Sequence, residues 1–202
     1  MEWEPVNARL ITARFYGTTT NISIVQGYVP TNDTEPEEEA EFYDTLQSTI
    51  DKILKKDLVI IMGDFNAKIG SDNTGREGVM GRQGEGEMNS NGELFVEMCA
   101  FNSMVIGGSI FPHKRIHKTT WVSPDHNTEN QINHICLSKR FRRSVQDVRV
   151  YRGADVASDH HLVVATLRPK LRKYNTRNPK VAPRYNIKLL QDPPSLRGFK
   201  LH

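Results

Sequence analysis

The feature that most constrains the fold is the apolar run from Leu58 to Met62, which is followed at once by Gly63-Asp64-Phe65-Asn66. A continuous apolar run of this length, bounded by turn residues, is typical of a strand that is buried on both faces. Such a strand needs cover on both sides, so the chain must fold into packed layers. The polar residues then stand at the carboxyl end of a buried strand, where ligands of α/β sheets commonly bind.

The rest of the chain alternates between strand-like and helix-like patterns. Thr34 can cap a helix that continues to Lys56, because Glu37 stands three residues later and apolar residues recur at helical spacing. A second helix is expected over residues 92–101. Strands are expected over residues 10–16, 21–27, 58–62, 104–106, 132–137, 145–151 and 162–167. We therefore expect an α/β domain, built as a two-sheet sandwich flanked by helices.

Composition and charge divide the chain into a domain and a tail. Of the 202 residues 37% are hydrophobic, yet no apolar run approaches the ~20 residues that a membrane helix needs, so we expect no membrane partner. Residues 168–202 hold ten Lys/Arg and one Asp, which leaves a charge of −6 for the residues before them. We place the domain at residues 1–168 and a basic tail at 169–202. The tail either contacts nucleic acid phosphates or is a solvated linker.

The two cysteines, Cys99 and Cys136, lie far apart and neither belongs to a C-x-x-C pair. This spacing argues against structural zinc and favours two reduced, buried thiols. The protein is therefore expected to be intracellular, and we place it in the nucleus. The sequence carries no indication of the oligomeric state.

Three groups of polar residues lie within the expected strands or directly beside their ends. Asp64 and Asn66 could bind a metal ion, orient water or contact a phosphate, or they could form an ordinary turn. Asp159 and His160 precede the last strand, and a carboxylate beside an imidazole can supply a metal ligand and a proton donor, although a polar loop has the same composition. Asn133 stands in an apolar strand, where it is either functional or a satisfied core amide.

Taken together, these groups resemble the endonuclease/exonuclease/phosphatase family. The order of motifs in that family is matched here by Tyr28-Val29-Pro30, Gly63-Asp64-Phe65-Asn66, Thr120-Trp121, Ile132-Asn133-His134 and Ser158-Asp159-His160. Further segments, at residues 63–70, 111–114 and 147–155, resemble endonuclease domains of RTE-type non-LTR retrotransposons and host proteins derived from them.

The resemblance implies a role for each matched residue. Tyr28 would contact the scissile phosphate, and Asp64 would orient or deprotonate the attacking water, with Asn66 beside it. Asp159 would help to hold a divalent cation, Mg²⁺ or Mn²⁺, and His160 would donate to the phosphate. The implied reaction is hydrolysis of a phosphodiester bond, with DNA as the implied partner.

Two departures from the family pattern predict impaired activity. The aspartate that pairs with the family's histidine is Asn133 here, and the same swap in the serine-protease triad costs about 10⁴ in kcat. The family's first metal ligand, a Glu on an early strand, precedes every matched segment, so we expect this chain to lack that Glu and the N-terminal strands of the fold. The alternatives to an impaired endonuclease are a non-catalytic remnant that binds nucleic acid or protein, and a phosphatase of the same fold.

Two further segments, one with histidines and one with basic residues, each have two possible roles. His113 and His117 have the spacing of zinc ligands on a helix, but Pro112 argues against a helix, and we favour a DNA-facing loop. The cluster from Lys139 to Arg143 is either a phosphate contact or a solvated connection between strands.

Overall fold

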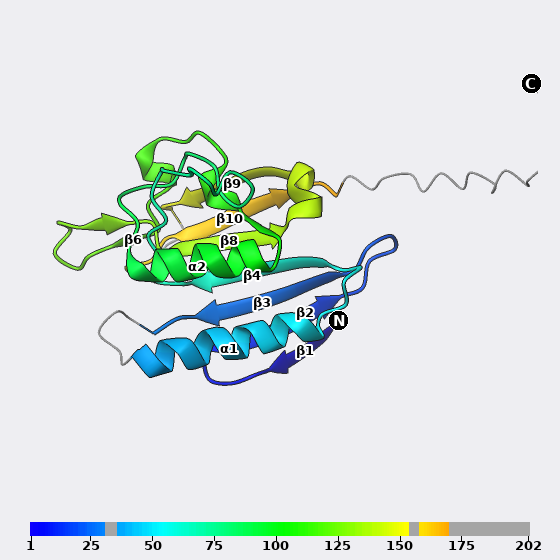
Figure 1. Cartoon of the computed structure of the whole chain (residues 1–202). Coiled ribbons are helices and arrows are strands. Elements are labelled where there is room, and N and C mark those ends of the chain that lie inside the picture. Colours follow the sequence, from blue (N-terminus) through cyan, green and yellow to red (C-terminus); the bar gives the residue numbers. More distant parts are fainter. Residues whose placement is uncertain (31–35, 154–157, 170–202) are drawn as a thin grey trace, which may run out of the picture. The chain divides into compact units, whose positions relative to one another are not determined.

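Ten strands, two α-helices and three 3₁₀ helices form the described part of the chain, which comprises residues 1–30, 36–153 and 158–169 of a computed structural model (Figure 1). A six-stranded sheet has the order β1-β2-β3-β4-β8-β5, formed by β1 (Glu2–Pro5), β2 (Leu10–Phe15), β3 (Ile22–Tyr28), β4 (Leu58–Asp64), β8 (Asn133–Ser138) and β5 (Met104–Ile106). Two pairs complete the strands: β9 (Val145–Tyr151) with β10 (Leu162–Leu167), and β6 (Trp121–Val122) with β7 (Glu129–Asn130). The helices are α1 (Pro36–Lys52), α2 (Ser90–Phe101), η1 (Gly107–Ser109), η2 (Arg115–His117) and η3 (Lys139–Ser144).

Two hydrophobic cores lie on opposite faces of the large sheet, and β4 contributes to both. Ile61 packs in the core beneath α1 and α2, together with the stacked rings of Phe65 and Phe95, whose centroids are 4.3 Å apart. Leu58 and Ile60 pack on the other face against β9 and β10. The expected burial of this strand on both faces is therefore confirmed, as is the α/β class. In the described residues, both α-helices cover one face of the large sheet, and β9 with β10 forms the second sheet layer.

Helix α1 follows from its amphipathic pattern and its terminal charges. Phe42 and Leu46 face the core and are at most 3% exposed, which stabilises the fold by roughly 1.5–3 kcal/mol for each side chain. The acidic first turn and Lys52 in the last turn complement the helix dipole. The helix ends at Lys52, so the prediction that it continues to Lys56 was wrong, and the predicted cap Thr34 lies outside the described residues.

Helix α2 begins earlier than expected because Asn89 caps it. The Asn89 side chain accepts a hydrogen bond from the backbone N–H of Gly92 at 2.8 Å, and its own amide donates to the carbonyl of Asn66 at 3.0 Å. Its Oδ1 also accepts from the backbone N–H of Lys68 at 2.8 Å. The cap therefore ties the start of α2 to the loop that follows β4.

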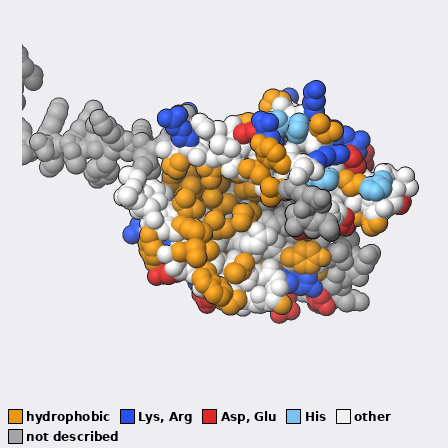
Figure 2. All heavy atoms as spheres, turned by 180° about the vertical axis from the view of Figure 1, so that it is seen from behind, with side chains coloured by type: hydrophobic (Ala, Val, Ile, Leu, Met, Phe, Trp, Pro, Cys, Tyr) orange, Lys and Arg blue, Asp and Glu red, His pale blue; other side chains and the backbone are white. Residues whose placement is uncertain are grey.

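Part of the large sheet has an apolar face that no described residue covers. Side chains alternate along β2, so Leu10 points into the helix-side core while Ile11 and Phe15 point to the opposite face. Ile11 is 41% exposed and Phe15 is 39% exposed, and Trp3 on the edge strand β1 is 63% exposed. Figure 2 shows a continuous apolar area on this side of the molecule. We call this surface, with Trp3, Ile11, Phe15 and Tyr28, the open face.

No helix in the described ranges is both long enough and apolar enough to span a membrane.

Candidate active site

Three of the predicted site residues form one row across the carboxyl end of the large sheet. β3 pairs with β4 in parallel and places Tyr28 opposite Asp64, while β4 pairs with β8 in antiparallel and places Asp64 opposite Asn133. Directly paired residues in neighbouring strands lie about 5 Å apart and point to the same face. The fold therefore brings Tyr28, Asp64 and Asn133 together, although they are far apart in the sequence.

His160 joins this row from the segment that precedes β10. Its Nδ1 lies 3.1 Å from Asn133 Oδ1, and its Nε2 lies 3.7 Å from Asp64 Oδ2 and 3.9 Å from Asp159 Oδ1. Because Asn133 Oδ1 is an acceptor, Nδ1 carries the proton of that hydrogen bond. Nε2 is then turned towards the carboxylates of Asp64 and Asp159.

The side chain of Asn66 lies behind Asp64. Its backbone has a positive φ of 47°, which asparagine tolerates better than most residues, and its backbone N–H donates to Asp64 Oδ1 at 3.0 Å. Its side-chain amide donates to the carbonyl of Val29 at 2.9 Å. Asn66 thus orients the Asp64 carboxylate and joins the end of β3 to the end of β4.

A pocket of about 510 Å³ contains the row and its histidine. Its lining includes Tyr28, Asp64, Asn133 and His160. Asn66 and Asp159 are adjacent to the pocket through their contacts with Asp64 and His160. The Asp64 side chain is only 11% exposed, whereas that of Asp159 is 48% exposed. The pocket therefore combines a shielded carboxylate with a solvated one.

The environment changes the proton affinity of Asp64. Burial raises the pKa of the Asp64 carboxyl above its ordinary value, and the nearby Asp159 raises it further. The N–H of Asn66 and the His160 ring oppose this change and lower the pKa. A carboxylate with a raised pKa is a better proton acceptor, which suits a general base.

A short segment around β6 holds the histidine and its neighbours in place. The hydroxyl of Thr120 accepts hydrogen bonds from the backbone N–H groups of Ile132 and Asn133 at 2.9 and 3.0 Å. The indole N–H of Trp121 donates to Asp159 Oδ2 at 2.9 Å, and the strand bridge between Trp121 and His160 aligns the two segments. The sequence pattern included Thr120-Trp121 but assigned no role to either residue, because the contacts join segments almost 40 positions apart.

His134 supports the site from the opposite side of β8. Its Nε2 donates to the carbonyl of Ala67 at 2.7 Å, and its ring stacks on Phe95 with centroids 5.1 Å apart. Burial lowers the pKa of His134 to about 4, so the ring is neutral at pH 7. It stabilises the loop that carries Asp64 and Asn66 without adding charge to the pocket.

His113 and His117, the other histidines singled out from the sequence, each have a partner of their own and do not lie in this pocket. His113 Nε2 lies 2.7 Å from Asp147 Oδ1, and His117 Nδ1 lies 3.3 Å from the carbonyl of Val150. Within the described residues, no group of three or more His, Cys, Asp or Glu side chains is placed to hold a metal ion. The role of His113 and His117 in DNA contact stays a prediction.

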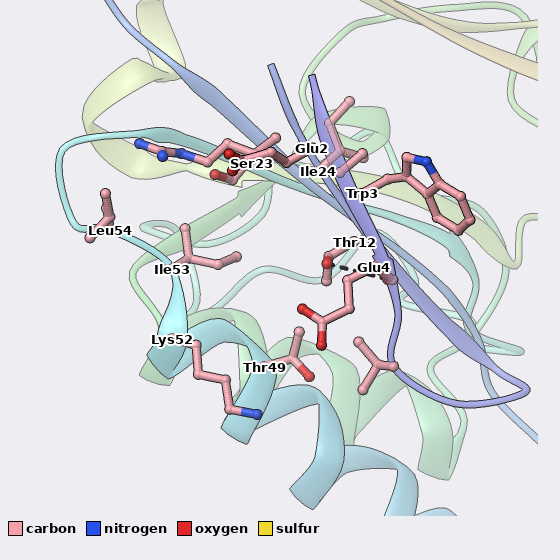
Figure 3. A pocket seen from close by; sticks show the side chains of 13 residues that line it. Glu2, Trp3, Glu4, Thr12, Ser23, Ile24, Thr49, Lys52, Ile53 and Leu54 are labelled. Atoms are coloured by element: carbon pink, nitrogen blue, oxygen red, sulfur yellow. Dashed lines mark hydrogen bonds between the residues drawn. The ribbon is translucent and has the colours of Figure 1, made fainter. Parts of the chain in front are cut away.

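A second pocket, of about 450 Å³, lies between β1–β3 and the end of α1 (Figure 3). Arg14, which lines it, is engaged with Asp57, since Nε donates to Asp57 Oδ2 at 2.6 Å. The Asp57 carboxylate also accepts from Ser23. The pair is therefore structural, and this pocket does not compete with the row at Asp64 as a catalytic site.

Comparisons with known proteins identify relatives by sequence and by fold. No protein-family model matches the chain. Over 168 residues, or 82% of its length, the chain is 39% identical to craniofacial development protein 2 of Bos taurus and 38% identical to the protein of the same name of Tragulus javanicus. The chain spans 28% and 29% of the length of these relatives.

Among solved structures, the endonuclease domain of TRAS1, a telomere-specific non-LTR retrotransposon, matches with a TM-score of 0.58 at 16% identity, covering 81% of this chain and 63% of that one. The 3′-5′ exonuclease NExo from Neisseria meningitidis matches with a TM-score of 0.56 at 17% identity, covering 79% of this chain and 65% of that one. A structure described as the 3′ phosphatase NExo bound to a product DNA hairpin also has a TM-score of 0.56. An endonuclease/exonuclease/phosphatase family protein from Leptotrichia buccalis has 0.50. At sequence identities this low, the structural matches show the fold alone. The chain is thus a homologue of craniofacial development protein 2 with the fold of the endonuclease/exonuclease/phosphatase family.

Proposed function

We propose that this chain is a retroelement-derived, Mg²⁺-dependent DNA endonuclease-like domain whose hydrolysis of phosphodiester bonds is impaired by Asn133. The observation that carries the proposal is the position of His160, which lies between the Asn133 amide and the carboxylates of Asp64 and Asp159. The names of two structures with this fold, a retrotransposon endonuclease domain and an exonuclease, support the same reaction class. Because DNA is the proposed substrate, we propose that the protein acts in the nucleus.

The proposed roles follow from burial and hydrogen bonding. Asp64, whose pKa is raised by burial, accepts a proton from the attacking water, and Asn66 keeps the carboxylate in position. His160 donates a hydrogen bond from Nε2 to a phosphate oxygen, where negative charge develops as the water oxygen bonds to phosphorus and the bond to the leaving sugar oxygen breaks. The leaving oxygen takes up a proton from solvent. Tyr28 lines the pocket on the other side of Asp64 and would contact the same phosphate.

The donor set suits a hard divalent cation. Asp159 and Asp64 offer carboxylate oxygens, which Mg²⁺ and Mn²⁺ prefer. When bound, the cation would stabilise charge on the phosphate oxygens. Asp159 is half exposed and is oriented by the Trp121 indole, so it is the residue that would hold the ion. In the part of the chain that the structure describes, no group of three His, Cys, Asp or Glu side chains is placed to hold an ion, so water would fill most of the ion's coordination sites and binding would be weak.

Asn133 is the second source of impairment. An aspartate at this position would balance a cationic His160, whereas the amide accepts the same hydrogen bond without supplying charge. Asp64 and Asp159 partly replace that charge, but they lie on the side of the ring that must face the phosphate. Position 133 therefore supplies no negative charge behind the ring when Nε2 faces the phosphate.

The proposal is tested by nicking of supercoiled plasmid DNA in Mg²⁺, with excess protein and an EDTA control. We expect the chain to nick near background, and Asn133→Asp alone to recover little, because cation binding stays weak. A longer chain that combines Asn133→Asp with the residues of the bovine relative outside the aligned 28% should nick readily. Asp64→Ala should abolish that activity, while Asp44→Ala, a matched exposed carboxylate on α1, should not.

Two results would overturn parts of the proposal. Robust nicking by the chain itself, lost on Asp64→Ala, would contradict impairment. Absence of nicking by the longer Asn133→Asp chain, with DNA binding retained, would favour a non-catalytic remnant. A phosphatase is favoured by the NExo structure described as a 3′ phosphatase. Release of phosphate from a 3′-phosphorylated oligonucleotide by the longer chain, without plasmid nicking, would identify that activity instead.

A further inference from the structure

A group of six cationic side chains gathers at the end of the large sheet opposite the candidate active site. It consists of two residues in the turn between α1 and β4 and four residues on η3, and every one is exposed: Lys55, Lys56, Lys139, Arg140, Arg142 and Arg143. We call this group the basic end. Neither the fold nor the proposed reaction requires it.

Specific contacts bring the two segments of the basic end together. The Arg140 guanidinium donates to the backbone carbonyl of Asp57 at 2.5 Å, which attaches η3 to the turn that carries Lys55 and Lys56. The same guanidinium lies 4.7 Å from the centre of the Phe141 ring. The backbone N–H of Lys139 donates to Ser103 at 2.8 Å. The cations are therefore held on a defined surface.

The charge of the basic end is not neutralised within the described residues. None of its six cations forms an ion pair there, although Arg115 and Arg152, near β7, pair with Glu129. The carboxylate of Asp57, which follows Lys56, is 1% exposed and is occupied by Arg14. The residues before Arg168 carry a net charge of −6, so this concentration of positive charge runs against the charge of the rest of the domain.

The basic end is well separated from the pocket. β4 begins beside it at Leu58 and ends in the pocket at Asp64, and six steps along a strand span roughly 20 Å. The antiparallel pairing of Ile60 with Leu137 places the end of β8, and so η3, at the beginning of β4. A ligand bound here would not be the phosphodiester that faces His160.

We infer that the basic end is a binding surface for the phosphate backbone of a nucleic acid, separate from the segment that enters the candidate active site. Lys and Arg side chains that are exposed and form no ion pair attract a polyanion to this end of an otherwise acidic domain. The surface also extends to Arg168, which is exposed and donates from its backbone N–H to the carbonyl of Ser144 at the end of η3. An extended polyanion matches this distribution better than a small anion does.

The inference does not depend on the proposed catalysis, and its test excludes catalysis. Binding of the full chain to a fluorescently labelled 20-base-pair duplex and to a single-stranded RNA of equal length is measured by anisotropy in EDTA at several salt concentrations. Lys55→Gln/Lys56→Gln and Arg142→Gln/Arg143→Gln each remove two charges from the basic end. Arg149→Gln/Arg152→Gln, which removes two cations that are already paired with Asp147 and Glu129, is the matched control. Thermal melts establish that all variants fold.

Each basic-end variant should lower the slope of log K against log salt by about two and weaken binding at 100 mM salt at least tenfold, while the control retains the original slope. The arm with the larger loss, duplex or RNA, identifies the preferred nucleic acid. Unchanged binding by both basic-end variants would overturn the inference, and so would an equal loss in the control. Binding of the chain to phosphatidylserine vesicles with the same charge dependence, but not to either nucleic acid, would also overturn it.

Discussion

Trp121 holds the most exposed carboxylate of the candidate site. Its indole N–H donates to Asp159 Oδ2 at 2.9 Å, and the side chain of Asp159 is otherwise 48% exposed. Groups that orient a metal ligand typically contribute 10- to 100-fold to metal affinity. We predict that Trp121→Phe weakens Mn²⁺ binding by about tenfold, as measured by electron paramagnetic resonance titration. Trp3→Phe, the matched change on edge strand β1, should leave the affinity unchanged, and an equal loss in both variants would contradict this role.

His134 makes the stability of the domain depend on pH. Its pKa is about 4 in the folded chain because it is buried, against an ordinary value of 6.5, so the unfolded chain binds more protons between these values. The stability that the neutral ring contributes is complete above pH 6.5 and is lost as the pH falls towards 4. The difference corresponds to about 3 kcal/mol in the free energy of unfolding.

Urea unfolding at pH 7, 6, 5 and 4 measures this dependence. His134→Gln keeps a donor for the carbonyl of Ala67 but cannot titrate, so it should be less stable at pH 7 and lose less stability on acidification. His126→Gln, at an exposed position in the turn between β6 and β7, should follow the original curve. A His134→Gln variant with the original pH dependence would show that other groups control acid unfolding.

At the scale of elements, the close approach of β3 and β4 depends on Gly63. Its φ of 149° is accessible mainly to glycine, and a Cβ atom there would lie 1.8 Å from the carbonyl oxygen of Gly27. Gly63→Ala must therefore displace β3 from β4 beside Asp64, and we predict a loss of about 3 kcal/mol or more. Gly153→Ala, which meets no atom within 4 Å, is the control in thermal melts. Equal stability of the two variants would contradict the strand geometry.

Local sequence patterns were sufficient to predict the strands that bury an apolar face. The expected strands at residues 10–16, 21–27, 145–151 and 162–167 differ from β2, β3, β9 and β10 by at most one residue at either end. The long apolar run was also identified correctly, because burial on both faces leaves no polar residues to obscure the pattern.

Strands that bury little apolar surface could not be predicted from local sequence patterns. β1, with the sequence Glu-Trp-Glu-Pro, is exposed at all four positions and exists only because it pairs with β2. β6 and β7 have two residues each, and their pairing is visible only in three dimensions. The polar site residues were identifiable from their motifs, yet the row formed by Tyr28, Asp64 and Asn133 depends on strand register, which no local pattern contains.

Within the described residues, the open face departs from a fully packed sandwich. Ile11 and Phe15 are about 40% exposed on a sheet face whose other end is covered by β9 and β10. Large exposed apolar patches promote association. We predict that the chain self-associates at micromolar concentration in sedimentation velocity, and that Ile11→Thr/Phe15→Thr shifts it towards the monomer. Ile116→Thr, at a 49% exposed position on η2, should not. A monomeric chain at all concentrations would contradict this prediction.

The proposed function depends most on whether Asp159 holds a divalent cation beside Asp64 and His160. The most direct measurement is an NMR titration of the isotope-labelled chain with Mn²⁺, whose paramagnetism broadens signals near the bound ion. We predict selective broadening of the Trp121 indole N–H and of the His160 ring signals, and loss of this broadening in Asp159→Asn but not in Asp125→Asn. Broadening centred on His113 and Asp147, or broadening at Trp121 that survives Asp159→Asn, would contradict the account.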